Sequence, residues 1–374
     1  MLCSRIRSLV LTTFITLVFA FTANAQSGRV QATPTPTPVD DTVRVVTEEI
    51  KLNVLAFDES GNFYRDVTTR DLVITENNIL HQPTSVRRLR ANVLIVMDTG
   101  GEMRAVKNLD QTRKVAKAVV GALRADDSVA IMKYADKVEV VSEWTENKTE
   151  TLTAIGKKTN FGRRSAYVEA LKMATALLLR LPADNRHLVL ITDGTDSLGQ
   201  SSAKFDAFQR LLATDISVHV ISYSAMEAAD IEPRTKGISN TPPPKAMPDE
   251  VAAGLPNGVR DVATAPKMKT ISLDRTLIKK MKARRNDLEA SQQQLEKIAE
   301  NTNGEFILPE TTDEMILKAP LVARTIDASY VVTYMPKISV VETRGIATRN
   351  IDVTSKRPGL IVQARRKLVI RSAN

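Results

Sequence analysis

Two aspartates stand at the ends of strongly apolar stretches, where their carboxylates could bind a cation or a polar group. Asp98 ends the stretch Ala91–Asp98, and Asp193 ends the similar stretch that starts at Arg186. Both stretches are typical of strands buried in a parallel sheet. The carboxyl ends of such strands form the crevice in which open α/β sheets bind ligands. We therefore predict that the two carboxylates lie together in one acidic crevice.

Residue patterns that indicate an enzyme are weak. The three histidines, His81, His187 and His219, lack metal-ligand spacing, and we interpret the last two as core or strand-end residues. The chain has no Gly-x-Ser-x-Gly elbow and no glycine-rich phosphate loop with a lysine. A hydrolase that uses Asp98 and Glu102 as paired carboxylates is an alternative, but these side chains supply neither a nucleophile nor a substrate pocket. We expect no enzyme, no catalytic residue and no organic cofactor.

Cysteine usage and charge limit the classes of partner. The single cysteine is Cys3, so a chain without its first residues has no disulfide and no thiolate metal site. The net charge is +9, but aromatic residues make up only 4% of the chain. That fraction is too small for the stacking platforms that bind single-stranded nucleic acid. We expect a protein partner and no nucleic acid.

The first residues have the order of an export signal. Arg5 and Arg7 precede an apolar run from Leu9 to Phe21, and small residues follow up to Ala25. This order predicts a signal peptide over residues 1–25, with cleavage before residue 26. The apolar run is too short for a membrane span. We expect a periplasmic, extracellular or cell-surface protein without a membrane span after cleavage.

Strand and helix patterns alternate through the middle of the chain. Strands are predicted over 93–98, 128–134, 138–144, 187–193, 216–222 and 305–308, and helices over 106–123, 166–181, 203–213 and 312–326. This alternation predicts a doubly wound, mostly parallel sheet with helices on both faces. The fold class is α/β, with this sheet inserted in a smaller β-sandwich-like domain made from both chain ends.

The remaining segments complete the predicted organisation. Short strands predict an N-terminal β unit over residues 43–90, which packs with C-terminal strands over residues 328–374, including one strand over 360–370. A Pro/Thr-rich linker covers residues 26–42. Within the α/β domain, residues 91–327, a proline-rich and weakly apolar stretch predicts a disordered insertion over 225–270. A long polar helix over 273–302 follows, either as a solvated arm or with a one-sided coiled-coil seam.

Residues 92–308 resemble a von Willebrand factor A domain. The motifs that carry the resemblance are Asp98 after its strand, the turn Gly162–Tyr167, and Thr192–Asp196 after the central strand. The segment from Leu295 to Gly304 and the strand from Ser329 are similar to segments of bacterial exported members. Together with the export signal, this order is similar to the exported von Willebrand factor A-related proteins of Acidobacteria.

The resemblance implies a metal-ion-dependent adhesion site, which is incomplete in this chain. The family pattern is Asp-x-Ser-x-Ser, and here Gly100 and Glu102 replace the two serines. The metal residues that the resemblance implies are Asp98, Glu102, Ser165 and Asp193. Mg²⁺ or Ca²⁺ would bind weakly or not at all, and Gly100→Ser with Glu102→Ser is expected to raise the Mg²⁺ affinity. The alternative is that Asp98 and Asp193 only cap helices and bind loop amides.

These observations favour an exported, non-enzymatic binding or adhesion module. It would dock a protein partner at the top of its α/β sheet, through an acidic side chain of the partner or through surface contacts. The alternative is a structural envelope or assembly component with an inert metal site.

Overall fold

The computed structural model describes residues 48–101, 108–182, 184–197, 201–239, 270–271, 274–339 and 346–371. The chain divides into two compact units, Met1–Val46 and Thr47–Asn374, and all described residues belong to the second. The predicted signal peptide, the predicted linker, Glu102 and residues 240–269 of the predicted insertion lie outside the described residues. Within the described ranges, no helix has both the length and the apolar character needed to span a membrane.

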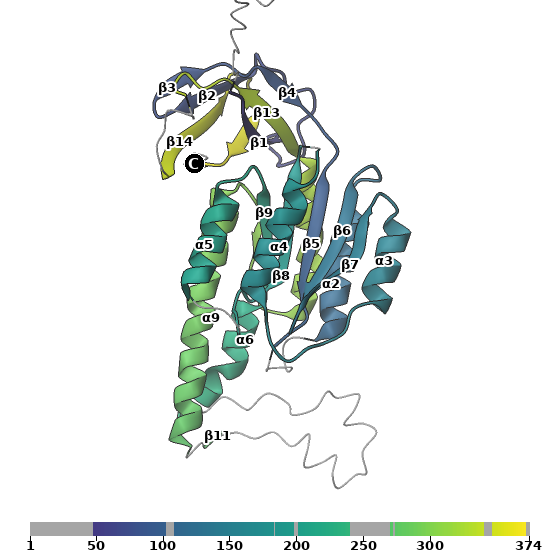
Figure 1. Cartoon of the computed structure of the whole chain (residues 1–374), viewed down its shortest axis with the longest axis vertical. Helices are drawn as coiled ribbons and strands as arrows, with labels where there is room; N and C mark the ends of the chain where they lie inside the picture. Colours follow the sequence, from purple (N-terminus) through teal and green to yellow (C-terminus); the bar gives the residue numbers. More distant parts are fainter. Residues whose placement is uncertain are drawn as a thin grey trace, which may run out of the picture. The chain divides into compact units, whose positions relative to one another are not determined.

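A six-stranded sheet forms the centre of the α/β part, in the order β12-β9-β8-β5-β6-β7 (Figure 1). Its strands are β5 (Asn92–Asp98), β6 (Ser128–Tyr134), β7 (Val138–Thr145), β8 (Arg186–Thr192), β9 (Ser217–Ser222) and β12 (Phe306–Ile307). All neighbours pair in parallel except β6 and β7, which form an antiparallel hairpin. The parallel strands are apolar along their length because both faces of the sheet are buried.

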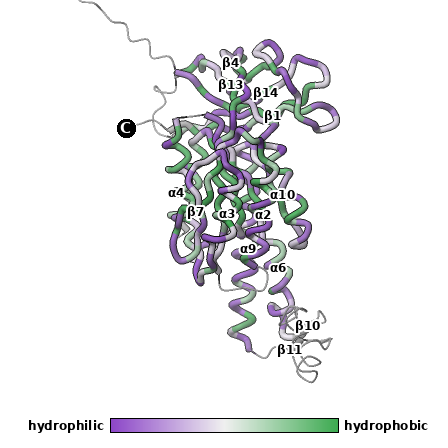
Figure 2. The backbone as a smooth tube through the Cα atoms, turned by 90° about the vertical axis from the view of Figure 1, so that its right-hand side faces the viewer, coloured by the Kyte–Doolittle hydropathy of each residue, from purple (hydrophilic) through white to green (hydrophobic). Residues whose placement is uncertain are grey.

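Helices cover both faces of this sheet. One face packs against α2 (Leu109–Ala122), α3 (Lys148–Lys157) and α10 (Thr312–Asp327), and the other against α4 (Tyr167–Leu179), α5 (Ser201–Leu212) and α9 (Arg275–Asn301). Alternate residues of β5 serve the two cores: Val93, Ile95 and Met97 lie in the first and Leu94 and Val96 in the second. Figure 2 shows hydrophobic residues concentrated where these strands and helices pack.

Two features of the α/β part differ from the predictions. Helix α3 was not predicted, and it forms because Asn147 caps it and Ile155 is buried against the core. The start of the predicted disordered insertion is ordered as α6 (Ser224–Ile231), a 3₁₀ turn (Glu232–Thr235) and β10 (Ile238–Ser239), which pairs with β11 (Thr270–Ile271). The reason is that α6 buries Met226 in the core with α2 and α10, buries Ile231 as well, and packs against α9, so a few apolar residues suffice.

Both ends of the described chain contribute to two four-stranded antiparallel sheets. One has the order β15-β1-β13-β4 and the other β16-β14-β2-β3. Their strands are β1 (Ile50–Phe57), β2 (Leu72–Glu76), β3 (Ile79–His81), β4 (Ser85–Arg87), β13 (Ser329–Tyr334), β14 (Ile346–Ser355), β15 (Ile361–Ala364) and β16 (Lys367–Arg371). Thus the single strand predicted over 360–370 is two strands in different sheets, because the chain crosses between sheets at Arg365–Arg366.

A common core fills the space between these two sheets, with Leu52, Leu72, Ile74 and Val332 among its buried members. This β-sandwich-like arrangement from both chain ends confirms the predicted fold class, whereas the domain boundaries stay a prediction. The sandwich contacts the amino end of β9: Asn53 Nδ2 donates to Ser217 Oγ at 3.0 Å, and Arg365 Nη1 donates to the Thr214 carbonyl at 2.6 Å. These contacts leave the carboxyl ends of the parallel strands to other loops.

Candidate functional site

Asp98 and Asp193 lie at the carboxyl ends of the neighbouring strands β5 and β8. Asp98 is the last residue of β5, and Asp193 follows β8 directly. Both side chains are buried. Asp98 Oδ1 accepts the Gly100 amide at 3.0 Å, and Asp193 Oδ1 accepts the Thr195 amide at 2.7 Å. Each aspartate therefore stabilises the loop that follows its own strand.

Ser165 belongs to a third loop that meets the other two. Its Oγ donates to the Thr195 carbonyl at 3.2 Å, and its carbonyl accepts the Ser197 amide at 2.9 Å. The same loop reaches the β5 end, where the Gly162 amide donates to the Thr99 carbonyl at 2.9 Å. The structure thus places Asp98, Ser165 and Asp193 on three contacting loops, while Glu102 lies outside the described residues.

Two buried tyrosines lie beneath these loops. Burial raises the pKa of Tyr134 well above its ordinary value, and the charges of Asp98 and Asp193 raise it further. Burial, Asp193 and Asp98 raise the pKa of Tyr167 in the same direction. Both carboxylates thus act on both phenols. Tyr134 OH also lies 2.6 Å from Thr192 Oγ1, which ties the end of β8 to β6.

An arginine from helix α9 reaches into this acidic region. Arg284 Nη2 lies 3.0 Å from Asp193 Oδ2 and 2.8 Å from Glu227 Oε2, and its Nη1 donates to Thr195 Oγ1 at 2.8 Å. Asp193 and Glu227 are buried, and the Arg284 side chain is 28% exposed. Burial by itself would lower the pKa of Arg284, but Asp193 and Glu227 outweigh it and raise the pKa. The guanidinium is therefore a permanent positive charge between two carboxylates.

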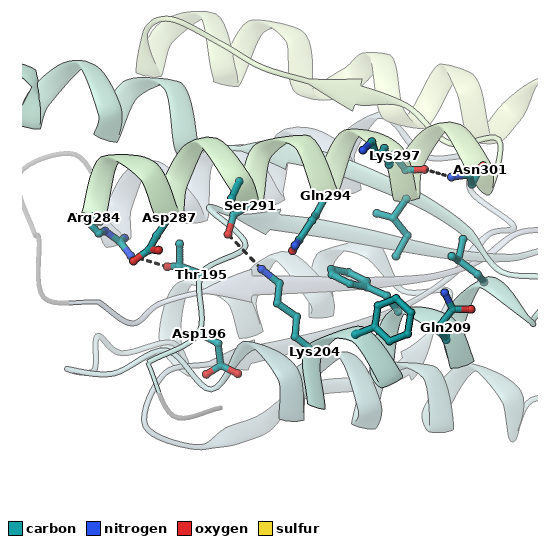
Figure 3. A pocket seen from close by; sticks show the side chains of 15 residues that line it. Thr195, Asp196, Lys204, Gln209, Arg284, Asp287, Ser291, Gln294, Lys297 and Asn301 are labelled. Atoms are coloured by element: carbon teal, nitrogen blue, oxygen red, sulfur yellow. Dashed lines mark hydrogen bonds between the residues drawn. The ribbon is translucent and has the colours of Figure 1, made fainter. Parts of the chain in front are cut away.

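Further polar contacts fasten α9 to the loop after β8. Lys204 of α5 donates from Nζ to the Gly194 carbonyl at 2.8 Å and to Ser291 Oγ at 3.2 Å (Figure 3). Ser291 Oγ donates to the same carbonyl at 3.1 Å. Gly194 has a φ of +72°, and a Cβ there would lie 2.8 Å from Leu295 Cδ1. A side chain at position 194 would therefore displace the Leu295 side chain of α9.

The described residues do not fit a divalent cation well. Asp193 Oδ2 and Thr195 Oγ1 already accept hydrogen bonds from Arg284. At Gly100, where the family pattern has a serine, a Cβ would lie 1.9 Å from the Arg164 carbonyl oxygen. Within the described part of the chain, no three His, Cys, Asp or Glu side chains are grouped so as to hold a metal ion. The oxygen atoms of Asp193 and Thr195 act instead as hydrogen-bond acceptors for a guanidinium.

A groove of about 590 Å³ opens next to these loops, between α5 and α9. Thr195, Asp196 and Arg284 line the end nearest the strand ends. Phe205, Phe208 and Leu212 provide its apolar lining, and Phe205 is 62% exposed. Polar residues of α9 also face it, among them Asp287, Gln294 and Lys297 (Figure 3). The groove combines an apolar floor with hydrogen-bonding groups, which is a common composition for binding sites.

Sequence reasoning missed Arg284 and Glu227. Glu227 lies in the segment predicted as disordered, and Arg284 is one of many basic residues in a polar helix. No local pattern distinguishes Arg284 from Arg285 beside it. Thr195 and Asp196 belong to the motif that carried the resemblance, and Asp196 Oδ2 accepts the Val168 amide at 3.1 Å, at the start of α4.

Comparisons with known proteins agree with this fold. Residues 93–195 match the family model described as von Willebrand factor type A domain. No curated protein sequence matches the chain. Solved structures similar to it include a von Willebrand factor type A protein from Catenulispora acidiphila, at 10% identity with a TM-score of 0.39, covering 88% of this chain and 75% of that one.

Two further solved structures are also similar to this chain. The conserved hypothetical protein BatB from Bacteroides thetaiotaomicron is 14% identical with a TM-score of 0.38, covering 63% of this chain and 98% of that one. The manganese-loaded TRAP protein of Plasmodium vivax is 10% identical with a TM-score of 0.35, covering 85% and 97%. The matched family model, the mostly parallel sheet and the helices on both of its faces show that the α/β part has the fold of a von Willebrand factor type A domain.

Proposed function

We propose that this chain is an exported, non-enzymatic binding module that docks a protein partner at the carboxyl end of its α/β sheet. The observation that supports docking is the groove between α5 and α9, which joins the loop after β8 to an exposed phenylalanine. Exposed aromatic side chains beside hydrogen-bonding groups are typical anchors of protein interfaces. Export is proposed from the residue order of positions 1–25, and mass spectrometry of the protein from culture should find a chain that starts near Gln26.

Paired surface variants test the docking proposal. Phe205→Asp places a charge in the groove, and Leu317→Asp places the same charge on α10, which packs on the opposite face of the sheet. Both positions are exposed, at 62% and 79%, so neither change should unfold the protein. The partner is first identified by capture from an envelope extract, and its Kd for each purified variant is then measured.

We expect Phe205→Asp to weaken binding at least about tenfold, the effect of losing one interface anchor, and Leu317→Asp to leave it unchanged. If the partner binds both variants with the same Kd, the groove is not its docking site. If the partner's affinity falls only with changes in the β sandwich, the alternative of an assembly component with an inert crevice becomes the better account. Ile361 of the edge strand β15 is 46% exposed, and Ile361→Asp is the matching variant for that alternative.

A further inference from the structure

The acidic site of this domain already contains a positive charge supplied by the chain itself. Arg284 makes three hydrogen bonds, to Thr195 Oγ1 on one side and to Asp193 and Glu227 on the other. Thr195 Oγ1 in turn donates to Asp193 Oδ1 at 2.8 Å. These bonds join β8, α6 and α9 at one point, and they use oxygens that a metal ion would otherwise coordinate.

The charges at this site also favour the arginine over a metal ion. Two carboxylates buried close together repel each other unless a cation lies between them. Arg284 supplies one positive charge at these carboxylates, and the Lys204 ammonium lies nearby, at the carbonyl of Gly194. A guanidinium suits this position because it stays protonated and holds several donors in a fixed plane. A divalent ion would have to displace it.

The loop after β5 also lacks room for the family's metal ligand. The Cβ of a serine at position 100 would overlap the Arg164 carbonyl oxygen, at 1.9 Å. Gly100 is therefore part of the packing between two loops. The Arg164 carbonyl group occupies the space that a side chain at position 100 would need. Position 100 thus offers no ligand atom, while Arg284 contacts Asp193.

We infer that Arg284 takes the place of the divalent cation, as a built-in counterion that holds helix α9 on the loop after β8. The site is then closed to metal in the intact protein, and removing the guanidinium exposes carboxylates that accept a divalent cation. This inference does not depend on the proposed docking function.

Melting temperatures of purified variants test the inference, with Mn²⁺ as the probe. Arg284→Ala is compared with Arg285→Ala, which removes the neighbouring arginine from the exposed pairs with Glu232 and Glu289. We expect Arg284→Ala to lower the melting temperature by about 6–10 °C, because a buried charge loses its partner, and Arg285→Ala to lower it by about 2 °C at most. Equal shifts for the two variants would overturn the inference.

The same three proteins are then melted in the presence of about 10 mM Mn²⁺. A site with a Kd of about 0.1 mM would raise the melting temperature by about 5–10 °C at that concentration. We expect such a rise for Arg284→Ala and none for the wild type or Arg285→Ala. A rise of this size in the wild type would overturn the inference, and so would its absence in Arg284→Ala. Should Arg284→Ala not fold, calorimetric titration of the wild type with Mn²⁺ decides, because measurable binding contradicts a closed site.

Discussion

Gly100 packs directly against the backbone of Arg164, so closely that a Cβ at position 100 would lie 1.9 Å from the Arg164 carbonyl oxygen. The Ala135 Cα would also be only 3.0 Å away. Backbone atoms on both sides leave no flexible side chain that could move aside. The close contact between the two loops therefore requires glycine at position 100.

Gly100→Ser should destabilise the protein, although the sequence alone suggests that it restores a metal ligand. We expect Gly100→Ser and Gly100→Ala to lower the free energy of unfolding by about 3 kcal/mol, since the two loops must separate. Urea unfolding measures the change. Equal destabilisation by alanine and serine would show that the Cβ is responsible. A serine variant as stable as the wild type, with a gain in Mg²⁺ affinity, would contradict this packing.

Gly194 offers a second test of loop geometry. Its φ of +72° is unfavourable for other residues, and a Cβ would lie 2.8 Å from Leu295 Cδ1. Gly194→Ala should therefore cost about 1–2 kcal/mol of unfolding free energy. The matched control is Gly121→Ala in helix α2, where a Cβ meets nothing within 4 Å. Gly121→Ala should raise the free energy of unfolding by up to about 1 kcal/mol. If Gly121→Ala instead lowers it, alanine is not tolerated even at an open helical position, and the loss in Gly194→Ala cannot be assigned to the loop.

The buried histidine pair predicts an acid-sensitive fold. His187 Nδ1 lies 3.0 Å from His219 Nε2, and His219 Nδ1 accepts the Glu305 amide at 3.1 Å. His219 therefore carries its proton on Nε2 and donates it to His187, whose own Nε2 proton points to Asn185 Oδ1 at 2.9 Å. Burial lowers the pKa of His219 to about 3. Burial first, and then the electrostatic effects of His219 and Arg124, lower the pKa of His187 well below its ordinary value.

The sign of the pH effect follows from these lowered values. Below about pH 6.5 the unfolded chain binds protons at both histidines and the folded chain does not, so stability is full above that pH and is lost as the pH falls. Each histidine should remove about 1.4 kcal/mol of unfolding free energy per pH unit. Urea unfolding at pH 7.5 and 5.5 measures this loss. NMR signals of both imidazoles that titrate near pH 6.5 in the folded protein would refute the prediction.

A buried ion pair in the β sandwich predicts strong coupling between two residues. Arg349 Nη1 lies 2.5 Å from Glu76 Oε1, and both side chains are buried. Arg349→Met should cost about 3–5 kcal/mol of unfolding free energy, because the buried Glu76 carboxylate, which also lies 3.5 Å from His81 Nε2, then loses the guanidinium. The double variant with Glu76→Met should cost much less than the sum of the single changes. Additive losses in this double-mutant cycle would show that the pair is not coupled.

Much of the α/β sheet could be predicted from the sequence. The apolar runs of β5 and β8 specify buried parallel strands, and their terminal aspartates follow from the chain order alone. Periodic apolar positions likewise specify α2 and α4 to within a few residues. These features depend on local patterns, in which each residue's neighbours along the chain already determine the element.

The tertiary structure decided what the site contains. Arg284 meets Asp193 across 91 positions of sequence, and His187 meets His219 across 32. Likewise, only the approach of the loop at Arg164 makes Gly100 incompatible with a side chain. Nothing local marks these residues, because their partners come from separate elements that meet only when the sheet and helices pack. The sequence alone therefore determined that two aspartates stand at the carboxyl ends of parallel strands, whereas folding determined that an arginine contacts one of them.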